Sequence, residues 1–133
     1  ILDTNILFSA LLSSTSSFSK TILQTEHKFY VNELVLVEIF KHKTRITELS
    51  QLSEDEVVQL FYRLLRRLEM YKEDLITSSN RLSAYQLCQD VDKEDTPHVA
   101  LTLELNGILW TGDKKLKEGL IRKGFDRFYE PPE

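Results

Sequence analysis

Short apolar runs alternate along the chain with longer stretches in which apolar residues recur every three or four positions. The apolar runs are typical of strands and fall at residues 1–2, 28–31, about 68–71, 108–110 and 125–128. The intervening stretches have the spacing of helices that bury one face. Strands that alternate with helices favour an α/β fold in which helices cover both faces of a parallel sheet.

Residues that begin helices occur between these runs. The positions that favour a helix start are Asn32, Ser53 with Glu56, Ser79 or Asn80, and Pro97. Ser53 and Glu56 have the spacing of a capping box, and the helix from Pro97 is expected to run to residues 106–107. The serine-rich stretch 13–19 is too short for a domain linker, so we expect it to join two helices.

Composition indicates one ordinary globular domain over residues 1–133. The chain is 41% hydrophobic and 29% charged, and it has no apolar stretch near the 20 residues that a membrane span needs. Cys88 has no partner for a disulfide, so we expect a cytoplasmic protein. The net charge of −4 argues against bulk coating of nucleic acid, but it is compatible with a nuclease that holds cations between carboxylates.

Four acidic residues lie where a predicted strand ends or a helix begins: Asp3, Glu38, Asp95 and Asp113. Taken singly, each is explained as a helix cap or a solvated surface group. Taken together, carboxylates from separate elements supply the oxygen ligands that one or two divalent cations need. The four acids therefore predict a metal-binding pocket at the carboxyl ends of the strands.

Several segments resemble the PIN-domain ribonucleases, many of which are toxins of bacterial toxin–antitoxin pairs. The segments are 1–7 (ILDTNIL), Glu38, the stretch leading to Asp95 and Ala100, and 109–116 (LWTGDKKL). The resemblance covers most of the chain and implies a three-layer α/β/α sandwich with a central parallel sheet. It also implies hydrolysis of RNA with Mg²⁺ or Mn²⁺, one or two ions, held by Asp3, Glu38, Asp95 and Asp113. Asn5 and Thr111 would support these acids, and a small antitoxin and a homodimer are the implied partners.

For three other residues near these motifs, Asp92, Glu94 and His98, the sequence allows either a functional or a structural role. Between residues 90 and 95 several acids compete for one role, and Asp92 and Glu94 either support a metal or decorate a solvated turn. His98 lies one helical turn beyond Asp95 and either contacts substrate or belongs to the core or rim.

Basic residues follow two of the acids. Lys41, Lys43 and Lys114 are candidates for contacts with RNA phosphates, although each also fits a solvated helix face. No P-loop or Gly-x-Ser-x-Gly motif is present, which disfavours nucleotide hydrolysis at a P-loop and covalent serine catalysis. The alternative function is a catalytically inactive PIN-like module that binds RNA or docks a protein; manganese binding separates the two.

Overall fold

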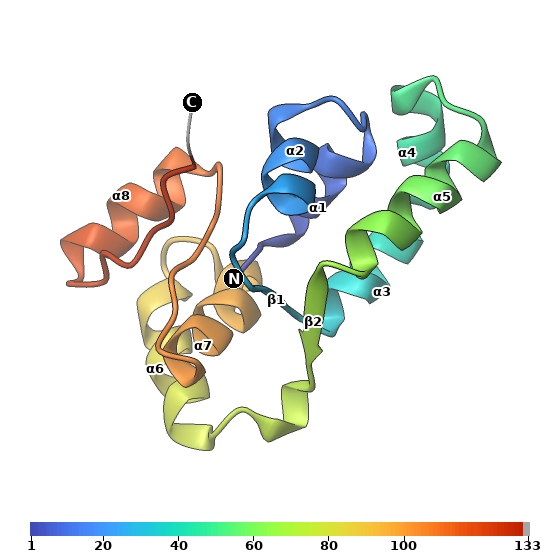
Figure 1. Ribbon diagram of the computed structural model, residues 1–133. Coiled ribbons are helices and arrows are strands. Elements are labelled where there is room, and N and C mark those ends of the chain that lie inside the picture. The colour runs from blue at the N-terminus through green and yellow to red at the C-terminus, as the bar shows by residue number, and fades with distance from the viewer. Residues whose placement is uncertain (132–133) are drawn as a thin grey trace.

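The computed structural model describes residues 1–131, and it is a mixed α/β structure made mostly of helices (Figure 1). The α-helices are α1 (Thr4–Leu11), α2 (Ser17–Gln24), α3 (Leu34–Lys41), α4 (Lys43–Ser50), α5 (Glu54–Leu65), α6 (Ser78–Cys88), α7 (Thr96–Glu104) and α8 (Lys114–Arg122). Two short 3₁₀ helices, η1 (Glu73–Leu75) and η2 (Lys93–Asp95), precede α6 and α7. The strands β1 (Phe29–Asn32) and β2 (Leu68–Tyr71) form a two-stranded parallel sheet.

Three other predicted strands continue this parallel arrangement as single bridges. Leu2 bridges Trp110, and Leu109 bridges Phe128, in both cases in parallel. The Leu2 N–H donates to the Tyr30 carbonyl at 3.0 Å, which attaches this segment to β1. The expected parallel direction is therefore confirmed, but these segments are shorter than predicted, because each leaves the sheet after one or two residues.

Alternate residues of the parallel segments face two different apolar clusters, as the period of two in a strand requires. One cluster packs against α1 to α5 and includes the strand residues Leu2, Phe29, Val31, Leu68 and Trp110. The other packs against α6, α7 and α8 and includes Ile1, Tyr30, Tyr71, Leu109 and Phe128. Helices therefore lie on both sides of the parallel segments (Figure 1).

Helix starts follow the predicted caps with two differences. The capping box of Ser53 and Glu56 opens α5, and Pro97 lies in the first turn of α7, both as predicted. Asn32 accepts a hydrogen bond from the Leu34 N–H at 3.0 Å, although Glu33 occupies the cap position of α3. The expected start of α6 at Ser79 or Asn80 is wrong, because the Thr77 side chain caps the helix and Ser78 is its first residue. Among the described residues, no helix is long and apolar enough to cross a membrane.

Candidate metal centre

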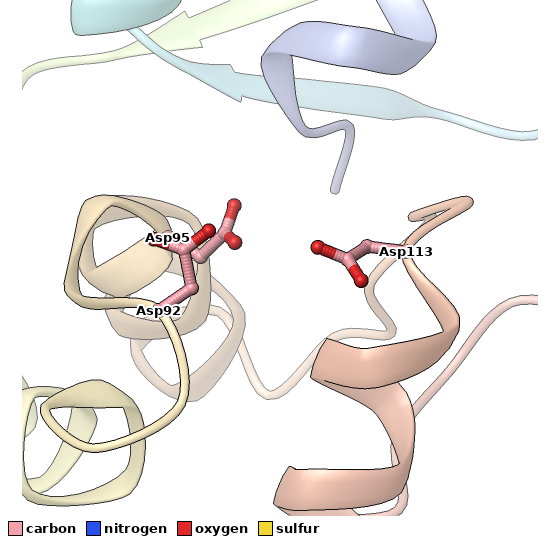
Figure 2. Close-up of side chains that lie close together, drawn as sticks. All are labelled: Asp92, Asp95 and Asp113. Atoms are coloured by element: carbon pink, nitrogen blue, oxygen red, sulfur yellow. The ribbon is translucent and has the colours of Figure 1, made fainter.

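Three carboxylates converge beyond the carboxyl ends of the parallel segments (Figure 2). Asp92 precedes η2, Asp95 is the cap residue of α7, and Asp113 is the cap residue of α8. One oxygen atom of each carboxylate lies within 4.8 Å of one from each of the others. Segments about twenty residues apart in the chain therefore bring three anionic oxygens to one place.

Local hydrogen bonds fix the orientation of two of these acids. The Asp113 carboxylate accepts from the Leu116 N–H at 3.1 Å, and the Thr111 hydroxyl accepts from the Asp113 N–H at 3.2 Å. Asp92 likewise accepts from the Glu94 N–H at 3.0 Å. Asp95 makes no such cap hydrogen bond, so its carboxylate is left to face the other two acids.

Asp3 is buried beside this group, with 3% of its surface exposed. Its carboxylate accepts from the Ile6 N–H at 2.9 Å and so caps α1. Burial raises the pKa of Asp3, as does the nearby Asp113, while hydrogen bonds from Thr111 and Ile6 act in the opposite direction. Asp3 and Asp113 are therefore close enough to repel each other when both are charged.

The electrostatics of Asp95 show how strongly the acids oppose one another. Burial, followed by the negative charges of Asp92, Asp3 and Asp113 in that order of effect, raises the pKa of Asp95 to about 7. Ionising Asp95 beside these acids is therefore unfavourable in the absence of a counterion. Carboxylate oxygens from separate elements are the ligands that Mg²⁺ and Mn²⁺ prefer, so the donor set fits such a cation.

All four acids predicted from the sequence line one cavity of about 240 Å³. Asn5, which is exposed, also lines it, as does Asp92. Glu38 is half-buried on α3 and reaches the cavity wall, but it lies outside the close group of three acids. The sequence assigned Asp92 only a supporting role, whereas the structure places one of its carboxylate oxygens within 4.8 Å of oxygens of both Asp95 and Asp113.

The basic residues at the cavity differ from those chosen from the sequence. Lys41, Lys43 and Lys114 are exposed, and the Lys43 ammonium lies over the ring of Phe40, 4.2 Å from its centroid. His42 lines the acidic cavity instead. The sequence pattern favoured the lysines of the basic run 41–45, whereas His42 and Arg45 are the residues of this run that line cavities beside Glu38.

His98 is buried in the wall of the same cavity, with 3% of its surface exposed. Within the described part of the chain its Nδ1 atom has no hydrogen-bond partner. Burial lowers the pKa of His98 to about 4, so the imidazole is neutral at pH 7. His98 is therefore a buried histidine, as one of the two interpretations from the sequence expected, and it also lines the acidic cavity.

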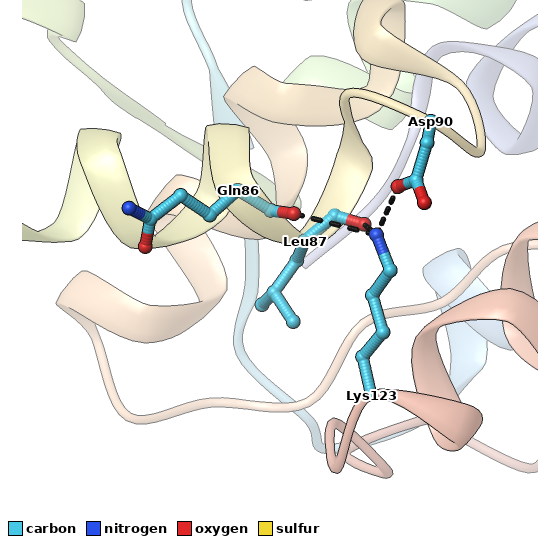
Figure 3. A network of polar contacts seen from close by, with 4 residues as sticks. All are labelled: Gln86, Leu87, Asp90 and Lys123. Carbon is cyan, nitrogen blue, oxygen red and sulfur yellow. Dashed lines mark hydrogen bonds and ion pairs between the residues drawn. The ribbon is translucent and has the colours of Figure 1, made fainter.

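A polar network holds the segment that carries Asp92 against the end of α8 (Figure 3). The Lys123 ammonium donates to the Leu87 carbonyl at 2.9 Å and to the Gln86 carbonyl at 3.3 Å, and it also pairs with Asp90. Positive charge at the carboxyl end of a helix, here α6, is favourable. The loop before Asp92 is thereby tied to the helix that Asp113 begins.

Taken together, mixed α/β architecture and an acidic cavity at the ends of parallel segments define a protein equipped to hold a divalent cation. The sequence matches the PIN domain over residues 1–128, and the chain belongs to this family. PIN domains form a nuclease superfamily whose members are typically metal-dependent. No curated protein and no solved structure gives a significant match to the chain.

Proposed function

We propose that the protein is a metal-dependent endoribonuclease that hydrolyses phosphodiester bonds in RNA. The observation that carries this proposal is the convergence of Asp92, Asp95 and Asp113, with buried Asp3 beside them, in a PIN-family chain. The proposal includes the three-layer α/β/α sandwich of the family, which the helices on both faces of the parallel segments support.

In this proposal the acids divide the work of holding Mg²⁺ or Mn²⁺. Asp92, Asp95 and Asp113 provide the close oxygen ligands, and Asp3 and Glu38 complete the negative wall. When bound, such a cation neutralises charge on the phosphate and lowers the pKa of water.

Two neighbouring residues keep the acids in place. Thr111 holds the Asp113 backbone, because its hydroxyl accepts from the Asp113 N–H, and it lowers the pKa of Asp3. Asn5 lies in the first turn of α1, two residues after Asp3, and it borders the cavity where substrate would enter.

The toxin role, a small antitoxin partner and a homodimer belong to the same proposal. Their support is an apolar groove of about 400 Å³ between α3, α4 and α5, which includes Phe40, 67% exposed, and Val58, 45% exposed. Exposed apolar surface of this kind commonly marks a protein interface. Co-expression with the product of an adjoining reading frame tests the toxin role: growth inhibition that the second protein relieves supports it, and growth unaffected by the chain alone opposes it.

Cleavage of labelled single-stranded RNA in the presence of Mn²⁺ tests the ribonuclease directly. The expected result is cleavage by the wild-type protein that disappears with a chelator and in Asp3→Asn. Asparagine keeps the cap of α1, because its side-chain oxygen still accepts from the Ile6 N–H. A circular dichroism spectrum near that of the wild type would therefore show that lost cleavage reflects lost charge.

Glu118→Gln on α8 is the matched control, because this exposed acid lies outside the cavity and should leave cleavage unchanged. Full activity of Asp3→Asn would overturn the assignment of the acids. Failure of the wild-type protein to bind Mn²⁺ at all would instead favour the inactive RNA-binding or protein-docking module.

A further inference from the structure

A second cavity adjoins the acidic one and has different chemistry. Its volume is about 230 Å³, several times the roughly 30 Å³ that a water molecule occupies in the liquid. Thr4, Asn5, Glu38 and His42 line both cavities, so the two share a wall. Residues of α1 on one side and of α3 and α4 on the other form this second cavity.

Phe8 and Arg45 line the second cavity but not the acidic one, and their side chains indicate which ligand it could bind. The ring of Phe8 is half-buried and meets the His42 ring edge to face, with centroids 6.4 Å apart. Arg45 is exposed, and within residues 1–131 no ion pair to it is present. An aromatic face and a guanidinium group without a carboxylate partner therefore stand next to a pocket of acids.

This combination suits one nucleotide of a single strand. Guanidinium groups bind phosphate oxygens with matched geometry, and bases stack on aromatic side chains whatever their sequence. The acids around Asp95 repel a polyanion, and the chain carries a net charge of −4, so a phosphate approaching them needs a cationic contact close by. Arg45 supplies that contact on the cavity that adjoins them.

We infer that this second cavity is a nucleotide subsite, in which Arg45 binds a phosphate next to the scissile one and the rings of Phe8 and His42 receive the base. The inference rests on the proposed ribonuclease function and adds to it the contact that positions the RNA. It also replaces Lys41 and Lys43, which the sequence pattern had favoured, with Arg45 in the first turn of α4.

The test compares Arg45→Gln with Arg66→Gln, an exposed arginine at the end of α5 that serves as the matched control. Binding of a fluorescent 2′-O-methyl RNA to the Mn²⁺-loaded protein is measured by anisotropy at several salt concentrations. Loss of one phosphate contact is expected to weaken binding at least fivefold. It should also flatten the slope of log K against log salt by about 0.7, the value for one contact to a single strand.

Cleavage kinetics and a second variant complete the test. Arg45→Gln is expected to raise KM at least fivefold with kcat unchanged, as for a group that binds substrate and transition state equally. Phe8→Leu keeps an apolar side chain but removes the ring, so it should weaken binding at least threefold without changing the salt slope. If either residue had only a structural role, the two variants would not differ in this way, with a flatter salt slope in Arg45→Gln and an unchanged salt slope in Phe8→Leu.

The outcomes distinguish the subsite from the function on which it rests. If the wild-type protein cleaves RNA and Arg45→Gln matches it, or if Arg66→Gln loses as much affinity, the subsite is wrong and the ribonuclease stands. If the wild-type protein neither binds nor cleaves RNA in Mn²⁺, both are wrong. A selective loss in Arg45→Gln supports both.

Discussion

Replacing Asp95 by asparagine should stabilise the protein in the absence of metal at pH 8. The pKa of Asp95 is raised from its ordinary value of 3.8 to about 7 by burial, followed by the charges of Asp92, Asp3 and Asp113. The folded state therefore favours the protonated acid. The stability that this provides is complete below about pH 4 and is lost as the pH rises through 7.

The size of the effect follows from the difference between the two pKa values. A group shifted from 3.8 to about 7 corresponds to roughly 4 kcal/mol if it is fully shielded from water. Asp95 is only half-buried, and solvent screening reduces the effect to about 1–2 kcal/mol. Asparagine carries no charge, and its amide can donate to Asp92 as the protonated acid does. No cap hydrogen bond is lost, because the Asp95 side chain makes none.

Urea unfolding in a chelating buffer at pH 5, 6, 7 and 8 measures this effect. The free energy of unfolding of Asp95→Asn should exceed that of the wild type by about 1–2 kcal/mol at pH 8, and this difference should shrink toward zero near pH 4–5. Saturating Mn²⁺ should reverse the order, because a ligand that binds only the folded state stabilises the wild type more than a variant with a poorer site. Asp126→Asn, an exposed acid distant in sequence, is the control and should show neither effect.

A lower stability of Asp95→Asn than of the wild type at pH 8 without metal would refute this reasoning. It would mean that the Asp95 carboxylate already has a favourable partner in the folded protein. A stability difference between Asp95→Asn and the wild type that does not depend on pH would also contradict the argument, because the substitution removes a carboxyl group that titrates in this range.

Three further variants test individual contacts. Asp3→Ala should cost about 1 kcal/mol more than Asp3→Asn in thermal or urea unfolding, because only alanine removes the acceptor for the Ile6 N–H; equal stabilities would exclude a capping role. Gly119→Ala places a Cβ atom 2.8 Å from two carbons of Val91, so it should cost about 1–3 kcal/mol, and adding Val91→Ala should recover most of the loss; no cost in the single variant would contradict the close approach. Arg67 donates to the Ile22 carbonyl in the last turn of α2 and to the Thr25 carbonyl just after it, so Arg67→Ala should lower the free energy of unfolding in urea by about 1.5–3 kcal/mol. Arg67→Lys should not fully restore this stability, because lysine lacks the planar fork of donors; full restoration by lysine would show that only the positive charge matters.

Periodicity was enough to predict the elements with strong local signals. The capping box at Ser53 and the proline at position 97 each fix a helix start through contacts within one turn, and the structure has both. The run at 68–71 has the bounds of β2, and β1 lies one residue later than predicted. The segments around Leu2, Leu109 and Phe128 pair only through single bridges, because pairing length depends on neighbours far away in the chain.

The composition of the acidic cavity was only partly accessible from the sequence. Asp3, Asp95 and Asp113 were recognisable because each occupies the cap position of a helix, where a carboxylate also satisfies or faces orphan N–H groups. The place of Asp92 in this group depends on the fold of residues 89–95 and on the hydrogen bonds from Lys123, which no local pattern specifies. His42 and Arg45 belong to the basic run 41–45, but their place at the cavity walls depends on how α1 faces α3 and α4, which no local pattern specifies.

Titration of the metal-free protein with Mn²⁺ by isothermal calorimetry tests the central claim most directly, since it needs no knowledge of the RNA. The wild type is expected to bind, Asp113→Asn is expected to bind at least tenfold more weakly, and Glu118→Gln on the same helix should match the wild type. Binding by Asp113→Asn as tight as that of the wild type would contradict the claim that Asp92, Asp95 and Asp113 together hold the cation.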